Sequence, residues 1–100
     1  MVVVDQIIQW PTKIRCFKAG SCHMSSDVDN LEELHAFARR IGLRRSWFQD
    51  HKLLPHYDLT VSKRAEAVTA GAIEVEAREY AMVRRARRKA AEQAAKGGAS

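Results

Sequence analysis

Residues 56–64, His-Tyr-Asp-Leu-Thr-Val-Ser-Lys-Arg, contain the densest group of side chains in this chain that can carry chemistry. The first four are β-prone, and residues two apart in a strand share a face, so His56 and Asp58 are predicted to point the same way. A histidine with a carboxylate beside it is suited to general acid–base catalysis, in which the carboxylate orients the imidazole. The pair therefore indicates proton transfer, as in a phosphoester hydrolase or transferase.

A helix is predicted directly after this strand, and its first turn carries groups that suit an anion. Thr60 or Ser62 is the expected N-cap, because either hydroxyl can accept a hydrogen bond from an amide of the first turn. Lys63 and Arg64 fall in that turn, where cations oppose the helix dipole. Amides, hydroxyls and cations together are typical of a phosphate site, and a solvated helix start is the simpler alternative. The predicted phosphate-binding residues are Thr60, Ser62, Lys63, Arg64, Arg44 and Arg45.

Two further histidines complete the predicted catalytic set. His23 alternates with Cys22 in a short β-prone stretch, so the two residues are expected on opposite faces of a strand. His35 borders the apolar side of a predicted helix, where a histidine is more often structural than catalytic. The predicted catalytic residues are His56, Asp58, His35 and His23.

Metal-ligand spacing is weak in this sequence. Zinc sites are typically marked by close pairs such as C-x-x-C or H-x-x-x-H, and the only tight spacing here is His56-x-Asp58. We therefore predict no metal ligand, while a catalytic metal bound by His56, Asp58 and a distant histidine stays open. No P-loop, Rossmann glycine pattern, G-x-S-x-G or C-x-x-C motif occurs, which argues against several common enzyme classes. The sequence does not specify a cofactor.

Short strands and amphipathic helices must position these side chains. Strands are expected at residues 2–4, 21–24, 56–59 and 72–75. The clearest helix is marked by apolar residues at helical spacing, and Gly42 suits the position just past its end. Asp27 or Asp29 is its predicted N-cap, and Asp29 with Glu32 has capping-box spacing. The apolar residues are Leu31, Leu34, Phe37, Ala38 and Ile41.

The length of 100 residues, 46% of them hydrophobic, predicts one domain with a modest core. We predict an α/β fold, a compact single domain over residues 1–79 with a small three- to four-stranded sheet and two packed helices. Residues 80–100 are the second predicted segment. It consists of a basic, Ala/Arg-rich C-terminal helix, whose sequence pattern runs over residues 76–95, and of a disordered tail at residues 96–100.

The basic charge is confined to one end of the chain. From Ala77 onward there are seven basic and two acidic residues, so this segment accounts for the whole net charge of +5. A projecting arginine-rich helix suits contact with RNA or DNA, and a solvated helix that aids solubility is an equal alternative. The predicted nucleic-acid contacts are Arg84, Arg85, Arg87, Arg88 and Lys89.

Several motifs of the chain are similar to those of one known family. They are Leu34-His35-Ala36-Phe37-Ala38, Ile41-Gly42-Leu43-Arg44, Trp47-Phe48-Gln49, His56-Tyr57-Asp58-Leu59-Thr60, Ser62-Lys63-Arg64, and Gly71-Ala72 with Glu74-Val75. Together they closely resemble the domain of unknown function 4031 family, small domains of bacteria and their phages. The resemblance covers roughly Val2 to Glu79 and implies a bacterial or phage origin but no particular activity. Val61 stands where many relatives are expected to have proline, which favours Thr60 as the N-cap.

We predict a domain that binds a phosphate ligand, either a nucleotide or a nucleic acid, and that acts as a His/Asp-dependent phosphoester hydrolase or transferase if it is an enzyme. The alternative is a non-enzymatic phage or bacterial accessory or adaptor protein. In that case the basic C-terminal helix would be its contact surface for a host macromolecule.

Location and partners follow from composition. No apolar run approaches the length of a membrane span, and the residues before Asp5 lack the basic flank of a secretory signal, so we expect a cytoplasmic protein that does not bind membranes. Cys16 and Cys22 are consistent with a disulfide or with two free thiols. The expected partner is a phosphorylated small molecule or a nucleic acid, with a protein partner as the alternative. A homodimer is compatible with a short domain that has an extended helix.

Overall fold

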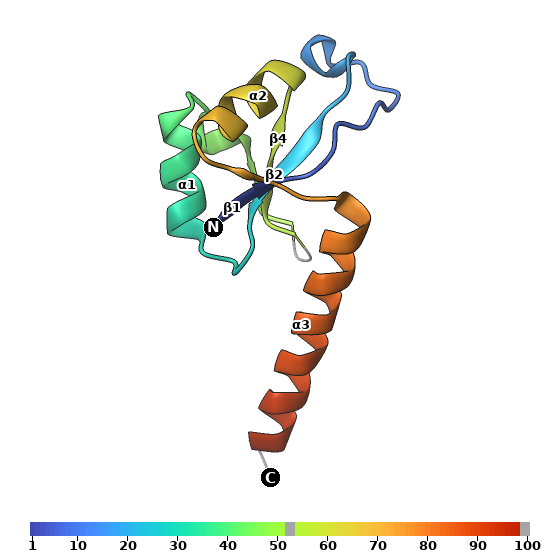
Figure 1. Ribbon diagram of the computed structural model, residues 1–100, viewed down its shortest axis with the longest axis vertical. Coiled ribbons are helices and arrows are strands. Elements are labelled where there is room, and N and C mark those ends of the chain that lie inside the picture. Colours follow the sequence, from blue (N-terminus) through green and yellow to red (C-terminus); the bar gives the residue numbers. More distant parts are fainter. Residues whose placement is uncertain (52–53, 99–100) are drawn as a thin grey trace.

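A mixed β-sheet forms the centre of the protein, with strand order β3-β4-β2-β1-β5 (Figure 1). The computed structural model describes residues 1–51 and 54–98, and within them the sheet has five strands. Strands β1, β2, β4 and β3 pair antiparallel, and β5 joins β1 in parallel. The strands are β1 (Val2–Val4), β2 (Cys22–Ser26), β3 (Phe48–Gln49), β4 (His56–Leu59) and β5 (Ile73–Glu74).

Three α-helices surround this sheet in the described part of the chain. They are α1 (Leu31–Arg40), α2 (Val61–Thr69) and α3 (Ala77–Gly98), together with the short 3-10 helices η1 (Arg15–Phe17) and η2 (Arg45–Trp47). The α/β prediction is confirmed. The prediction of three to four strands is wrong, because β3 adds a fifth. With only two residues, β3 is too short to show the alternation that marks a strand in a sequence.

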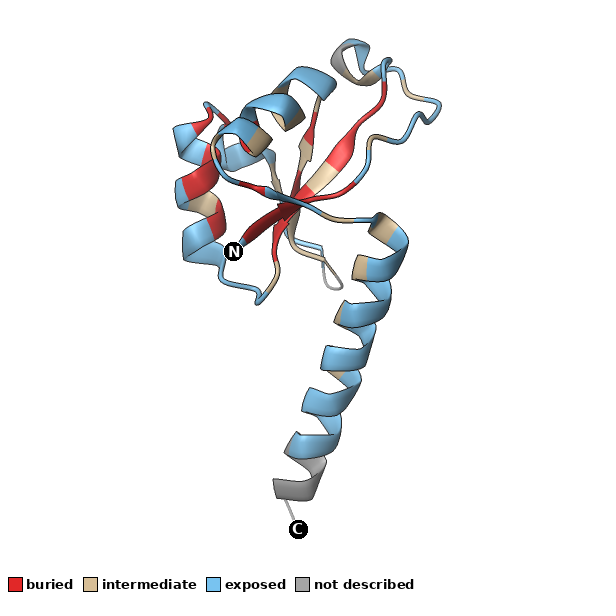
Figure 2. Cartoon of the chain, in the orientation of Figure 1, coloured by how far each residue is buried: buried red, intermediate tan, exposed pale blue. Residues whose placement is uncertain are grey.

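The pairing register separates the two faces of the sheet. Met24 lies opposite Tyr57 and Val4, while His23 lies opposite Asp58. Because residues directly opposite each other share a face, Met24 and Tyr57 lie on one side and His23 and Asp58 on the other. The first side forms the core beneath α1 and α2, and its buried residues appear red in Figure 2. The second side carries the polar residues.

Helix α1 packs on the core through Leu34, Phe37 and Ala38, as the apolar spacing predicts. Its N-cap is Asn30, whose side-chain oxygen accepts a hydrogen bond from the Glu33 amide at 3.1 Å. The predicted caps Asp27 and Asp29, and the capping box of Asp29 with Glu32, are therefore wrong. Asp29 adopts a left-handed φ of 54°, so the chain turns there and the helix begins later.

Local signals at the end of α1 and at the start of α2 are confirmed. Gly42 has a φ of 83° just past the end of α1, a conformation that glycine adopts without steric cost. Thr60 is the N-cap of α2, and its hydroxyl accepts a hydrogen bond from the Lys63 amide at 3.2 Å. Strand β4 therefore leads into α2 within a single residue, and this fixes how the polar residues of β4 are presented.

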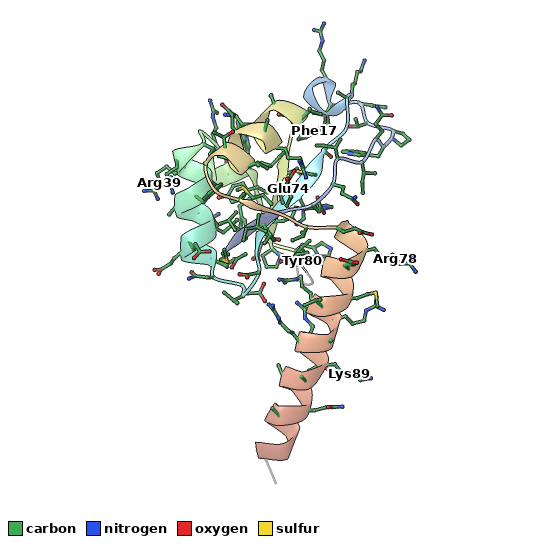
Figure 3. The ribbon with its side chains drawn as sticks, viewed as in Figure 1. Phe17, Arg39, Glu74, Arg78, Tyr80 and Lys89 are labelled. Atoms are coloured by element: carbon green, nitrogen blue, oxygen red, sulfur yellow. The ribbon has the colours of Figure 1, made fainter. Side chains whose placement is uncertain are left out.

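Helix α3 docks through its first turns and then extends away from the sheet, mostly exposed (Figures 1 and 2). The Tyr80 hydroxyl donates to the Ser26 carbonyl at 3.2 Å, and Arg84 pairs with Asp29 at 2.7 Å. Figure 3 shows Tyr80 directed toward the sheet, with Arg78 and Lys89 pointing away.

The length of α3 differs from the prediction at its C-terminal end. Residues 96–98, predicted as disordered, continue the helix, and residues 99–100 of that predicted tail lie outside the described part of the chain. The predicted boundary between residues 79 and 80 falls within α3. Among the described residues, no helix combines the length and the apolar character that a membrane span requires.

The cap of α2 supplies a stability test with a matched control. Replacing Thr60→Ala removes the hydroxyl that accepts the Lys63 amide, so we expect the free energy of unfolding to fall by about 1 kcal/mol. Ser62→Ala, which removes a hydroxyl that lies 3.2 Å from Thr60 Oγ1, should change stability much less, because the bond from the Lys63 amide to the Thr60 hydroxyl remains. Urea unfolding at constant m-value measures both, and equal losses would show that Thr60 is not the cap that matters.

Candidate functional site

Three polar side chains from β2 and β4 converge on the face of the sheet opposite α1. The Nε2 atom of His56 lies 3.3 Å from Oδ1 of Asp58, and the Nε2 atom of His23 lies 4.0 Å from the same oxygen. One ligand atom from each residue lies within 4.8 Å of the other two. The two imidazole rings meet edge to face, with centroids 4.6 Å apart. We call this group the His/Asp cluster.

A fourth residue, Asp5, holds His23 in place. Its Oδ1 accepts the His23 amide at 2.6 Å, and its Oδ2 accepts the Nδ1–H of the His23 ring at 2.8 Å. Asp5 is only 6% exposed, so its carboxylate is fixed by these bonds rather than by water. Asp5 was not among the predicted site residues, because its contact with His23 depends on the antiparallel pairing of β1 with β2, which no local spacing in the sequence shows.

Both histidines of the cluster have their Nδ1 atoms engaged outside it. His56 donates its Nδ1–H to the Leu54 carbonyl at 2.6 Å, as His23 does to Asp5. In each neutral ring the Nε2 atom therefore carries the lone pair, and each Nε2 faces Asp58. Asp58 thus lies at Nε2 of His56, while the Leu54 carbonyl holds the Nδ1 of His56 and Asp5 holds the Nδ1 of His23.

Contacts of the His/Asp cluster shift the pKa values of His23 and Asp58 in opposite directions. The hydrogen bond to Asp5 raises the pKa of His23 above its usual value, although burial opposes the rise. The contact with His56 Nε2, which donates to Asp58 only when the ring is protonated, lowers the pKa of Asp58, again against the effect of burial. Asp58 is therefore held as a carboxylate that faces two imidazoles.

A cleft of about 380 Å³ separates this part of the sheet from helix α3. On the sheet side it is bounded by Asp5, His23 and Leu54. On the helix side it is bounded by Ala77, Tyr80, Ala81, Arg84, Arg85 and Arg88. Three of the predicted nucleic-acid contacts thus line the same cleft as a histidine of the cluster. We call it the α3 cleft.

Comparison with known proteins identifies the family of this chain. A family model described as Protein of unknown function (DUF4031) matches residues 2–89 of the 100 residues. The chain belongs to this family. No curated protein and no solved structure matches it. The expectation that the arginine-rich end lies outside the family is wrong, since the DUF4031 match extends to Lys89 and so includes the part of α3 that lines the cleft.

In this DUF4031 domain the predicted phosphate site at the start of α2 is occupied by internal contacts. The Thr60 hydroxyl caps the helix and lies 3.2 Å from the hydroxyl of Ser62. The Lys63 ammonium donates to the Ile41 carbonyl at 2.6 Å and pairs with Glu66 at 2.9 Å. These groups join α2 to the end of α1 instead of converging on a common point.

The arginines assigned to that phosphate site also lie apart. Arg64 donates from Nε to the Asp5 carbonyl at 2.8 Å and pairs with Glu74 at 2.9 Å, so it supports the strand end beside the cluster. Arg44 stacks over Trp47, while Arg45 stacks over the Phe48 ring at 4.9 Å from its centroid. Arg64 thus contributes to the site as a support for Asp5, a function that the sequence did not indicate.

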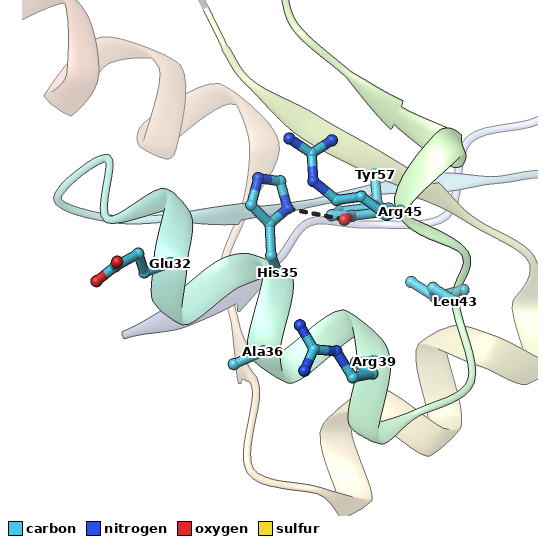
Figure 4. A pocket seen from close by; sticks show the side chains of 7 residues that line it. All are labelled: Glu32, His35, Ala36, Arg39, Leu43, Arg45 and Tyr57. Carbon is cyan, nitrogen blue, oxygen red and sulfur yellow. Dashed lines mark hydrogen bonds between the residues drawn. The ribbon is translucent and has the colours of Figure 1, made fainter.

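His35, predicted to join the catalytic set, lies on the other face of the sheet (Figure 4). Its Nδ1 is hydrogen-bonded to the Tyr57 hydroxyl at 2.8 Å, and Tyr57 alternates with the cluster residues of β4. The two residues line a separate cleft of about 450 Å³, whose walls are Glu32, His35, Ala36, Arg39, Leu43, Arg45 and Tyr57. The structure therefore brings together His23, His56 and Asp58 but not His35.

The other two predicted nucleic-acid contacts of α3, Arg87 and Lys89, do not line the α3 cleft. Arg87 donates to the Asp27 carbonyl, which docks the helix, and Lys89 points away from the domain (Figure 3).

Cys22 is a free thiol, 2% exposed, and burial raises its pKa to about 12. A thiol with that pKa is not a nucleophile near neutral pH, so Cys22 is a core residue.

The environment of His35 predicts a pH dependence of stability. Burial, and then the nearby Arg45, hold the pKa of His35 below its usual 6.5. The unfolded chain therefore takes up a proton at higher pH than the native chain, and stability should fall as the pH drops through 6.5 toward the native pKa. His35→Gln should reduce this loss in urea unfolding at matched pH values, with the facing residues Glu32, Arg39, Arg45 and Tyr57 unchanged. An unaltered acid sensitivity would contradict the assignment.

Proposed function

We propose that this protein binds phosphate esters of a nucleotide or nucleic acid in the α3 cleft and cleaves or transfers them with the His/Asp cluster. One observation carries the proposal: the α3 cleft has His23 and Asp5 on one wall and Arg84, Arg85 and Arg88 on the other. Cations that bind phosphate and groups that move protons are thus on opposite sides of one cavity. That combination is expected of a phosphoryl-transfer site.

The arginines have different tasks in this arrangement. Arg84 is held by Asp29 at 2.7 Å and by the Ser26 carbonyl at 3.2 Å, so it fixes α3 against the sheet. Arg85 and Arg88 lie along the same wall of the cleft, beyond this anchor. Guanidinium groups bind phosphate oxygens through paired N–H donors, which holds a phosphate in a defined orientation.

The His/Asp cluster carries out the proton transfers of the reaction. In hydrolysis, the oxygen of a water molecule bonds to phosphorus and gives up one proton, the ester P–O bond breaks, and the leaving oxygen gains one proton. The two imidazole Nε2 atoms and the Asp58 carboxylate are the groups of the cluster that can assist this exchange, since both Nδ1 atoms are already engaged. A hydroxyl acceptor in place of water gives a transferase by the same steps.

The competing proposal is a non-enzymatic accessory or adaptor protein that uses the same basic helix. It shares the binding step and lacks turnover, so the two proposals separate on catalysis alone. The contacts of α3 favour a binding surface that includes the sheet, because the first turns of the helix share a cleft with His23 and are held to the sheet by Tyr80.

Turnover is tested with chromogenic phosphate monoesters and diesters, including p-nitrophenyl thymidine phosphate. We expect release of p-nitrophenolate by the full chain, and a fall in kcat of about 10²- to 10⁴-fold in His56→Gln and Asp58→Asn. His35→Gln, which alters a histidine on the opposite face, should retain activity. Binding of nucleotides with no turnover by the unaltered chain would contradict catalysis and favour the accessory protein.

Phosphate binding by α3 is tested through its salt dependence. We expect Arg85→Ala to weaken the binding of a labelled single-stranded oligonucleotide and to reduce the slope of log K against log salt by about 0.7, the loss of one phosphate contact. Arg78→Ala removes the same charge from the side of α3 that points away from the sheet, so it should change the slope less (Figure 3). Fluorescence anisotropy at several salt concentrations measures both, and equal effects would assign the binding to diffuse charge.

A further inference from the structure

We propose that His23, His56 and Asp58 bind a divalent transition-metal ion, with Zn²⁺ the ion that these ligands favour. The binding of the ion stands on the geometry of the cluster alone. Its role as the group that activates water rests on the proposed phosphoester chemistry. In the metal-bound form the two Nε2 atoms and Asp58 would serve as ligands, and the metal-bound water would replace them in the proton exchange described above.

The spacing of the donor atoms suits one ion. Zinc ligands at about 2.0–2.2 Å in a tetrahedron lie roughly 3.3–3.6 Å from each other. His56 Nε2 and Asp58 Oδ1 are 3.3 Å apart, and His23 Nε2 is 4.0 Å from the same oxygen. The widest separation among the three donors is within 4.8 Å, so a closure of about 1.5 Å at most completes the tetrahedral spacing.

Hydrogen bonds at the Nδ1 atoms of the two histidines orient their Nε2 atoms for a metal ion. A metal-bound histidine characteristically donates its other ring N–H to a carboxylate or a backbone carbonyl, which fixes the tautomer and orients the lone pair. His23 donates to the buried carboxylate of Asp5, and His56 donates to the Leu54 carbonyl. Two strands and one loop thus present two Nε2 lone pairs to one carboxylate, independently of any contact within the cluster.

The donor set decides the class of ion. Ca²⁺ and Mg²⁺ prefer oxygen ligands, whereas two imidazoles and one carboxylate suit Zn²⁺ and its first-row neighbours. Three protein ligands leave a coordination position for water, as in catalytic zinc sites, and zinc lowers the pKa of such a water to about 7. The bound water would lose a proton to solvent, bond to phosphorus and displace the ester oxygen, which takes a proton from water. His23 is the ligand that lines the α3 cleft, where phosphate would lie.

The experiment uses the full chain stripped with a chelator and titrated with Zn²⁺ by calorimetry, and with Co²⁺ by visible absorption. We expect one ion per chain, with Co²⁺ bands of a four-coordinate site. His56→Gln and Asp58→Asn should abolish this binding. Asp5→Asn should weaken it about 10- to 100-fold, because it removes the negative charge and one of the two oxygens that accept hydrogen bonds from His23. His35→Gln is the matched control and should bind as the unaltered chain does.

Circular dichroism of each variant separates loss of the site from loss of the fold. If a variant unfolds, the imidazole signals of the unaltered chain decide: Zn²⁺ should shift those of His23 and His56 together and leave His35 in place. Absent binding, or stoichiometric binding that survives both His56→Gln and Asp58→Asn, would overturn the metal site. Zn²⁺ bound at the cluster without phosphoester turnover would support the site and reject the proposed function. Turnover undiminished by chelation would support the proposed function and overturn the role of the ion in activating water.

Discussion

The contact of Asp5 with His23 is the constraint on which the rest of the site depends. One buried carboxylate accepts both the backbone amide and the ring N–H of His23, so it fixes the strand pairing and the ring orientation together. Arg64 from α2 donates to the Asp5 carbonyl, which joins this strand end to the helix that follows β4. An isolated buried carboxylate would be costly, and these bonds offset that cost while directing His23 Nε2 toward Asp58.

The division of the sheet into two faces explains how a small domain supports both a core and a polar site. Tyr57 and its neighbours on one face pack beneath α1 and α2, whereas the alternate positions of the same strands carry the His/Asp cluster. Helix α3 covers part of the second face and is held there by Tyr80 and Arg84. Part of the positive charge of the chain, on Arg84, Arg85 and Arg88, is thereby placed across a cleft from His23.

Local features were predictable from the sequence, and their meeting in space was not. The strand at 56–59 and the Thr60 cap follow from alternation and capping chemistry within a few residues. The cap of α1 was misplaced because the left-handed backbone at Asp29 has no reliable signal in its neighbours. The cluster was only partly anticipated, since it depends on β1 and β4 flanking β2, which brings Asp5 and Asp58 to His23 and places His35 on the other face.

A crystal structure of the full chain grown with Zn²⁺ and a non-hydrolysable nucleotide would show whether the His/Asp cluster binds a metal ion and the α3 cleft binds phosphate. We expect an anomalous zinc peak between the Nε2 atoms of His23 and His56 and the carboxylate of Asp58, with the nucleotide phosphate in the α3 cleft beside Arg85. A nucleotide bound instead in the cleft of His35, with no ion at the cluster, would contradict it.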